Sequence, residues 1–142
     1  MLGTNMTWEK IFEQTDRDIN LQRVMNIMVY DNETGEHDWI PDRAIGPTDD
    51  SLYEKEKDYN DQQLSNILSK SLTEISKMKT SAKREILMQH RKEELRKLIT
   101  VYYAQRGWSA TGIPKVETLK QIGLWNFLSD EARTKVTAMN GV

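Results

Sequence analysis

The chain has 142 residues, of which 30% are charged, and its 22 acidic and 20 basic residues leave a net charge of −2. This length predicts a single domain with a hydrophobic core, and the balanced charge argues against a general nucleic-acid-binding protein. The sequence contains no cysteine, which excludes disulfides, thiolate metal ligands and thiol nucleophiles within it. It also lacks a basic and apolar leader and a run of about 20 apolar residues, so we expect a cytoplasmic protein without a membrane-spanning helix.

The first predicted helix runs from about Trp8 to Val29. Thr7 precedes it and can cap it, because a hydroxyl group accepts a hydrogen bond from an unpaired N–H of the first turn. Apolar residues recur along this segment at helical spacing, and we expect the stripe to form a buried face. The stripe consists of Trp8, Ile11, Phe12, Thr15 and Ile19, followed by Leu21, Val24, Met25 and Met28.

Residues 31–48 predict a long loop, because turn-forming residues occupy 31–35 and prolines stand at 41 and 47. This loop opens an acidic part of the chain. Residues 31–61 contain 11 acidic and 3 basic side chains, a local net charge of −8. A short helix is expected within it, over 52–57. Its candidate N-caps are Thr48, Asp49 and Asp50.

The central part of the chain predicts two long helices. No glycine or proline occurs between Pro47 and Gly107, and the residues there favour helix. Apolar residues three and four positions apart predict one amphipathic helix over Leu64–Met78. A second long helix is expected over about 80–106, with Gly107 as a left-handed C-terminal cap.

The last predicted elements are two short helices. Pro114 suits the first position of one helix, since its φ is fixed and it has no N–H to leave unpaired, and Gly123 ends that helix. Ser129 caps the other. The sequence therefore predicts an all-α fold: one irregular helical domain over residues 1–142, with about five helices, two of them long and central, and a long loop at 31–48.

Candidate catalytic or metal-binding residues are few. His37 stands between Glu36 and Asp38, but adjacent residues lack the spacing that places metal ligands on one face. His90 is expected on a solvated helix face. No phosphate-binding loop, nucleophile elbow or HExxH motif occurs. We therefore assign no catalytic, cofactor-binding or metal-binding residue to this chain.

A basic segment follows the acidic one. Lys77–Lys97 contains 8 basic and 3 acidic side chains, a local net charge of +5. Such a segment could bind the phosphates of a nucleic acid, but no aromatic residue is interleaved with these bases. We favour pairing with the acidic segment upstream, or simple solvation, and expect neither a nucleic acid nor a membrane as a partner.

Near the end of the chain, a tyrosine pair precedes an Arg-Gly-Trp sequence, and Gly-Ile-Pro and Gly-Leu sequences follow. The residues concerned are Tyr102, Tyr103, Arg106, Gly107, Trp108, Gly112, Ile113, Pro114, Leu119, Gly123 and Leu124. This pattern resembles the extreme C-terminus of the tungsten-containing aldehyde:ferredoxin oxidoreductases. Ser109 departs from the acidic residue that usually follows the tryptophan in that family.

Two earlier segments are similar to the same family and occur in the same order. Residues 8–28, which include Asn20, Leu21, Arg23 and Asn26, resemble a Leu-Glu-Arg…Phe-Asn helix of the family. Pro41-Asp42-Arg43 resembles its Leu-Pro-x-Arg sequence. The middle of the chain, from about residue 50 to residue 85, matches poorly and looks inserted or divergent.

The resemblance implies an oxidoreductase whose cofactors lie elsewhere. In the family, two pterin dithiolenes hold a tungsten ion beside a cysteine-ligated 4Fe–4S cluster, aldehydes are oxidised to acids, and ferredoxin accepts the electrons. The cluster cysteines and an Asp-x-x-Gly-Leu pterin motif lie upstream of the matching portion, and this sequence contains neither. We therefore expect a C-terminal fragment or separately encoded piece that supports the upstream cofactor domains and has no activity of its own. Formation of a homo-oligomer would be one way to cover apolar surface exposed on such a piece.

A stand-alone helical interaction module is the alternative interpretation. Its docking surface would be a hairpin formed by Leu64–Met78 and Met88–Tyr103. Capture of a partner by this chain would favour that interpretation. Steeply salt-dependent retention on polyanions would instead favour nucleic-acid binding by the basic segment.

Overall fold

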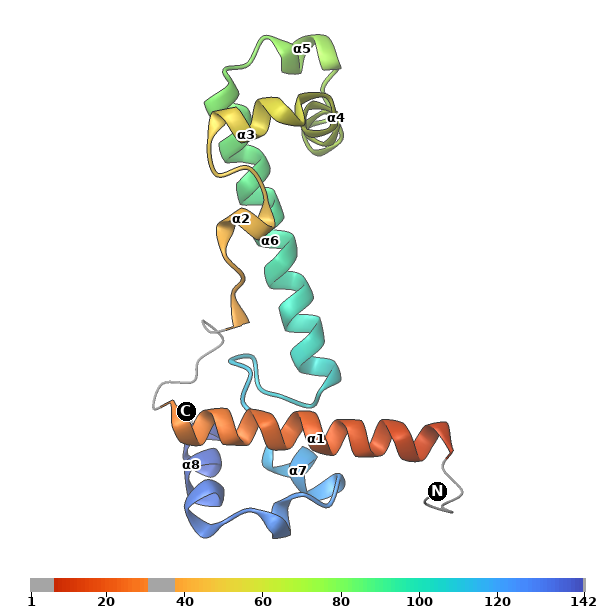
Figure 1. The fold of residues 1–142 in the computed structure, drawn as a ribbon, viewed down its shortest axis with the longest axis vertical. Coiled ribbons are helices and arrows are strands. Elements are labelled where there is room, and N and C mark those ends of the chain that lie inside the picture. The colour runs from red at the N-terminus through yellow and green to blue at the C-terminus, as the bar shows by residue number, and fades with distance from the viewer. Residues whose placement is uncertain (1–6, 31–37, 142) are drawn as a thin grey trace. The chain divides into compact units, whose positions relative to one another are not determined.

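The structure, a computed structural model, describes residues 7–30 and 38–141. Helices account for its regular structure, and within the described ranges the only β pairing is an isolated bridge between Trp108 and Pro114. The predicted all-α class is therefore confirmed (Figure 1). The helices are α1 (Trp8–Val29), α2 (Asp42–Ile45), α3 (Asp50–Lys55), α4 (Lys57–Leu68), α5 (Leu72–Ser76), α6 (Thr80–Gln105), α7 (Val116–Gln121), the 3-10 helix η2 (Trp125–Phe127) and α8 (Asp130–Asn140).

The chain divides into two compact units, each with its own core. The first unit contains residues 1–38 and 100–142, and the second contains residues 39–99. Helix α6 contributes its last residues to the first unit and the rest to the second. The single domain expected over residues 1–142 stays a prediction. No helix in the described ranges has the length and apolar composition needed to cross a bilayer.

In the first unit, α1 packs against α7 and α8 around an aliphatic core. Thr7 caps α1 as predicted, since its hydroxyl oxygen accepts a hydrogen bond from the N–H of Lys10 at 3.4 Å. Ser129 caps α8 in the same way, accepting from the N–H of Ala132 at 3.2 Å. The buried core residues are Val24, Leu119, Leu124, Leu128, Ala132 and Val136.

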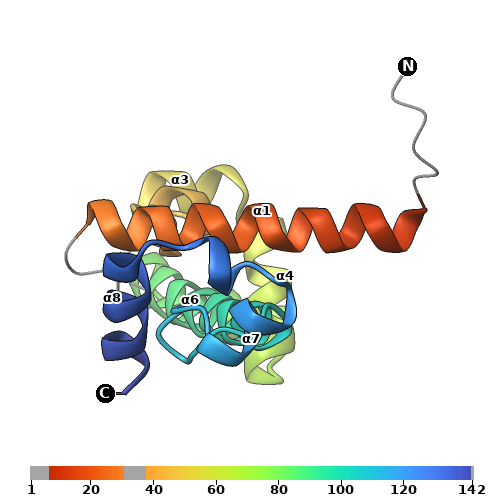
Figure 2. The same ribbon diagram turned by 90° about the horizontal axis from the view of Figure 1, so that it is seen from below.

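The predicted buried stripe of α1 is wrong over most of its length: Val24 alone among its nine residues is buried, and Leu21 and Met25 in its C-terminal half are exposed. Trp8 is 73% exposed and Phe12 is 64% exposed. The reason is visible in Figures 1 and 2, where the N-terminal half of α1 extends beyond α7 and α8, so none of the described helices of the first unit covers it. The residues of α1 that are buried lie on a different and partly polar face: Asn20, Arg23, Val24 and Ile27.

In the second unit, α3, α4, α5 and α6 surround the buried residues Tyr53, Leu64, Ile75 and Leu87. The single helix predicted over Leu64–Met78 is wrong. Ser69 adopts a left-handed conformation, with φ of 53°, which ends α4. Ser71 and Glu74 then form a reciprocal capping box that starts α5. Of the two long central helices predicted, α6 is therefore confirmed, and the other is divided into α4 and α5.

The remaining local predictions concern helix ends. Asp49 proves to be the N-cap of α3, accepting from the N–H of Leu52 at 2.9 Å. Gly107 has a φ of +68°, as expected for a left-handed cap after α6. Pro114 does not begin a helix, because it pairs with Trp108 and α7 starts after Lys115.

The predicted loop at 31–48 is described only in part. Residues 31–37, with His37, lie outside the described ranges. The remainder contains the short helix α2, which follows Pro41 directly.

Candidate functional site

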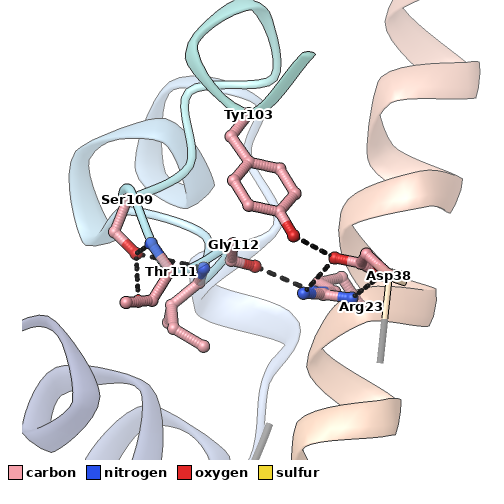
Figure 3. A network of polar contacts seen from close by, with 7 residues as sticks. Arg23, Asp38, Tyr103, Ser109, Thr111 and Gly112 are labelled. Atoms are coloured by element: carbon pink, nitrogen blue, oxygen red, sulfur yellow. Dashed lines mark hydrogen bonds and ion pairs between the residues drawn. The ribbon is translucent and has the colours of Figure 1, made fainter. Parts of the chain in front are cut away.

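Arg23 is the centre of a polar network in the first unit. Its side chain lies on the buried face of α1 and is 7% exposed. The guanidinium group forms a two-point ion pair with Asp38, in which Nη1 and Nη2 lie 2.9 and 2.8 Å from the two carboxylate oxygens. The hydroxyl group of Tyr103 donates to the same carboxylate. Figure 3 shows Arg23 and Tyr103 converging on Asp38.

The network fixes the turn that follows α6. Nε of Arg23 donates to the carbonyl oxygen of Gly112 at 2.8 Å (Figure 3). Gly112 has a φ of +80°, and a Cβ atom at this position would lie 2.6 Å from Nη2 of Arg23 and 2.8 Å from Cζ of Tyr103. Both the backbone conformation and the close approach of these side chains therefore require glycine here.

Ser109 organises the same turn from its other side. Its Oγ accepts hydrogen bonds from the backbone N–H groups of Thr111, at 3.3 Å, and Ile113, at 3.1 Å. A carboxylate oxygen at this position can accept the same two bonds, as aspartate does in comparable turns. The serine that departs from the acidic residue of the resembling family thus retains the acceptor that the turn needs.

Trp108 connects this turn to α1 and α6. Its indole N–H donates to the side-chain oxygen of Asn20 on α1 at 2.9 Å. The guanidinium group of Arg23 lies over its ring, 5.0 Å from the centroid, and Tyr102 meets the ring edge to face at 5.7 Å. Trp108 thus folds back on the preceding helix.

A second buried cluster lies in the second unit. Nζ of Lys83 lies 2.8 Å from a carboxylate oxygen of Asp61, and the hydroxyl group of Tyr53 donates to the same oxygen at 2.7 Å. Lys83 is 1% exposed, and its ammonium group also lies over the ring of Tyr53 at 5.1 Å. Lys83 is therefore not available to a substrate, because its charge is paired with Asp61 and its side chain is buried.

The protonation states of both clusters favour structure over catalysis. Burial, the hydrogen bond to Asp38 and the charge of that carboxylate raise the pKa of Tyr103 well above its usual value. Burial and Asp61 do the same for Tyr53. Burial by itself would raise the pKa of Asp61, but the hydrogen bonds from Lys83 and Tyr53 outweigh it and hold that pKa below its usual range. At neutral pH both tyrosines therefore remain protonated and act as hydrogen-bond donors.

Hydrogen bonding within both clusters is complete. In the part of the chain that the structure describes, every buried side-chain nitrogen and oxygen atom has a hydrogen-bond partner. An unpaired buried polar atom usually marks a place where a ligand or water belongs. Both clusters are therefore best explained as internal connections that fix the backbone.

The basic segment pairs with the acidic one, as favoured from the sequence. Three of the eight basic side chains of residues 77–97 contact carboxylates of the segment 31–61. These pairs are Lys83–Asp61, Arg84–Asp50 and Lys92–Asp42, at 2.8, 2.9 and 2.7 Å.

The structure adds two observations on the histidines and metal ligands. His90 is half-buried on α6 and lines a groove together with residues of α4 and the segment before α2. Among residues 7–30 and 38–141, no three His, Cys, Asp or Glu side chains lie close enough together to hold a metal ion. The assignment of no catalytic, cofactor-binding or metal-binding residue stays a prediction.

Sequence reasoning did not find the Arg23 network. Its members are distant along the chain, since Tyr103 follows Asp38 by 65 residues and Gly112 follows Arg23 by 89. One local signal was available: Asn20, Arg23, Val24 and Ile27 recur at helical spacing and define the face that is buried.

Comparison with known proteins gives one match. The family model described as "Aldehyde ferredoxin oxidoreductase, domains 2 & 3" matches residues 1–124. No curated protein and no solved structure matches the chain. The matched range includes most of the 142 residues and the whole of the Arg23 network.

Proposed function

The chain belongs to the aldehyde ferredoxin oxidoreductase family, and on that premise we propose that it is the C-terminal helical part of such an enzyme. It supports the part that binds the cofactors and has no activity of its own. The observation on which this proposal rests is the family match over residues 1–124. The reaction proposed for the complete enzyme is oxidation of an aldehyde to a carboxylic acid, with transfer of electrons to ferredoxin.

The cofactors proposed for that enzyme, a tungstopterin and a 4Fe–4S cluster, do not fit the residues of this chain. The cluster needs thiolate ligands, and the sequence has no cysteine. The buried polar atoms of both described clusters already have protein partners. We therefore derive no chemical step from this chain and assign cofactor binding to other parts of the enzyme.

The face of α1 around Trp8 is the surface proposed to contact those parts. Phe12 lies 6.4 Å from Trp8, ring centroid to centroid, and Ile11 beside them is 38% exposed. An apolar patch of this kind is typical of a surface that a partner covers. Since none of the described elements of the first unit covers it, we propose that it packs against the cofactor-binding part of the enzyme.

The alternative function, a stand-alone interaction module, loses much of its support. Its docking hairpin required the apolar residues of Leu64–Met78 to face outward. Leu64 and Ile75 are instead fully buried in the core of the second unit, where Leu87 contacts them.

The proposal is tested first on the native protein that contains this sequence. Its intact mass is measured, and tungsten and iron are assayed in the same sample. We expect both metals, either in a longer chain or in a complex with a cofactor-binding subunit. A metal-free chain of 16.6 kDa without such a partner would overturn the proposal.

A second test concerns activity. The isolated 142-residue chain is incubated with an aldehyde and a viologen electron acceptor. We expect no reduction of the viologen, whereas clear turnover would refute the absence of activity.

The proposed contact surface is tested by substitution. Trp8→Asp combined with Phe12→Asp should abolish co-purification with the cofactor-binding part and leave the melting temperature unchanged, because both side chains are exposed. Tyr59→Asp is the matched control, since Tyr59 is 60% exposed but lies in the second unit. Retention of the partner by the double variant would show that this face is not the contact.

A further inference from the structure

The second unit contains a groove that the proposed function does not use. It has a volume of about 440 Å³ and lies between α4, α6 and the segment around α2. Its walls are mainly apolar. The lining side chains that matter here are the apolar Ile40, Ile67, Leu95 and Leu98 and the polar Gln63 and Arg91.

Arg91 is partly buried at this groove and has an unusual set of partners. Its Nη2 donates to Gln63 Oε1 at 2.6 Å and to Asn60 Oδ1 at 3.2 Å, and its Nη1 makes a long contact of 3.4 Å with the carbonyl oxygen of Ile45. Among the described residues, all acceptors of Arg91 are thus neutral amide or carbonyl oxygens. Its positive charge has no carboxylate partner there.

Five other cations that are buried or half-buried differ from Arg91 in this respect. They lie within 3 Å of a carboxylate oxygen: Arg23 of Asp38, Lys83 of Asp61, Arg84 of Asp50, Lys92 of Asp42 and Arg106 of Asp16. A partly desolvated charge without a counter-charge is costly, and an incoming anion relieves that cost.

The backbone keeps the guanidinium group in place. A Cβ atom at Gly46 would lie 2.6 Å from Nη1 of Arg91 and 2.8 Å from Sδ of Met88. Glycine therefore leaves the space that the guanidinium group occupies, and the bonds to Gln63 and Asn60 orient it. A charge positioned in this way binds a ligand with little loss of conformational entropy.

We propose that this groove, lined by Arg91 and by Ile40, Ile67, Leu95 and Leu98, binds a small amphipathic carboxylate. The carboxylate group contacts Arg91, because its negative charge compensates a guanidinium charge that has no carboxylate partner among the described residues. The apolar part of the ligand lies along the walls formed by α4 and α6. The volume falls within the range of roughly 300–1,000 Å³ that is usual for small-molecule sites. This site is independent of the aldehyde chemistry proposed above.

Two further titratable groups face the groove. Glu94 lies one turn from Arg91 on α6, and a hydrogen bond from Lys97 at 2.6 Å lowers its pKa, so it is ionised at neutral pH. His90 lies beside them on the same helix. Because Glu94 repels an anion, removing its charge should strengthen binding at Arg91.

The test measures binding of octanoate to the full chain by calorimetry, with 1-octanol and acetate as comparison ligands. Octanoate should saturate one site. Acetate and 1-octanol should bind at least about tenfold more weakly, because each lacks either the tail or the charge. Equal affinity for 1-octanol, or no saturable binding of octanoate, would overturn the proposal.

Variants then locate the site. Arg91→Gln should weaken octanoate binding about tenfold or more, while Glu94→Gln should strengthen it about twofold. The control Arg133→Gln removes an arginine from the other unit and should leave affinity unchanged. If Arg91→Gln bound octanoate as tightly as the unsubstituted chain, the anion would not lie at Arg91 and the proposal would be wrong.

A further variant tests the site even if Arg91→Gln does not fold. Leu98 is 67% exposed, so Leu98→Asp should leave the melting temperature unchanged while placing a charge on the apolar wall. We expect octanoate binding to fall at least about fivefold. Unchanged affinity in this folded variant would also overturn the proposal.

Discussion

Arg23 in the first unit and Lys83 in the second unit are both buried cations, and each pairs with an aspartate that also accepts a hydrogen bond from a tyrosine. Each also lies over an aromatic ring, at 5.0 Å for Arg23 and 5.1 Å for Lys83. The two clusters differ in what they connect. Arg23 reaches a backbone carbonyl 89 residues away, whereas Lys83 bonds an aspartate 22 residues away.

The difference explains why the first cluster uses an arginine and the second uses a lysine. The planar guanidinium group of Arg23 offers separate donors for a carboxylate and for a backbone carbonyl, so it fixes a turn in a defined position. The ammonium group of Lys83 is a point charge that neutralises Asp61 inside a helical core. We therefore expect the first unit to depend on donor geometry and the second unit to depend on charge balance.

The largest expected effect tests charge balance. Lys83→Met should lower the free energy of unfolding by about 3–5 kcal/mol, because it leaves Asp61 buried without its counter-charge. Urea unfolding followed by circular dichroism measures the change. Lys79→Met, at an exposed position immediately before the same helix, is the matched control and should change stability by less than about 0.5 kcal/mol. A loss below about 1 kcal/mol for Lys83→Met would show that the pair is not important for the second core.

The next largest effect distinguishes crowding of the Arg23 and Tyr103 side chains from strain in the backbone. Gly112→Ala should cost about 2–4 kcal/mol, since it adds both a strained φ and a clash with Arg23 and Tyr103. Gly123 also has a positive φ, of +70°, but a Cβ atom there would come no closer than 3.3 Å to Arg17. Gly123→Ala should therefore cost about 1–2 kcal/mol, from the backbone alone. Equal losses in the two variants would mean that crowding around Arg23 contributes nothing.

The next prediction concerns the donor geometry of the Arg23 guanidinium group. Arg23→Lys keeps the charge but loses the two-point ion pair and the bond to the carbonyl oxygen of Gly112, so stability should fall by about 1–3 kcal/mol. Arg133→Lys, at an ion pair whose partner Asp130 is 98% exposed, should have an effect within about 0.5 kcal/mol. Thermal unfolding of both variants provides the measurement. If Arg23→Lys were as stable as the unsubstituted chain, the fork geometry would be irrelevant.

The smallest expected effects concern pH. The pKa of Tyr53 and that of Tyr103 are raised by folding, so their contribution to stability is complete below the unfolded value of about 10 and is lost as the pH rises above it. The pKa of Asp61 is lowered by folding, so its contribution is present above the unfolded value of about 3.9 and is lost as the pH falls through the folded value.

Both pH effects can be measured. Tyr103→Phe should reduce the loss of stability above about pH 10, as followed by denaturant midpoints at several pH values. Tyr53→Phe removes a donor to Asp61 and should change the loss of stability at both acid and alkaline pH. If both phenylalanine variants lost stability above about pH 10 as the unsubstituted chain does, the raised pKa values would be contradicted.

Local sequence signals determined much of the secondary structure of this protein. Thr7, Asp49 and Ser129 each accept the hydrogen bond expected of an N-cap, and Gly107 adopts the left-handed conformation expected after α6. These features depend on a few neighbouring residues, so a sequence contains nearly all the information needed to place them. The break at Ser69 was missed because a left-handed serine has no strong local signature.

Only the tertiary structure decided which faces are buried and which charges pair. Periodicity indicated an apolar stripe on α1, but the buried face contains Arg23, because burial depends on which elements pack against the helix. The partners of Arg23 come from residues 38, 103 and 112, and no local rule connects them. The sequence by itself determined an all-α chain of the aldehyde ferredoxin oxidoreductase family, since helix signals and the terminal motif are local. The pairing of Arg23 and the lack of a carboxylate partner at Arg91 among the described residues depend on long-range packing, which a linear pattern does not specify.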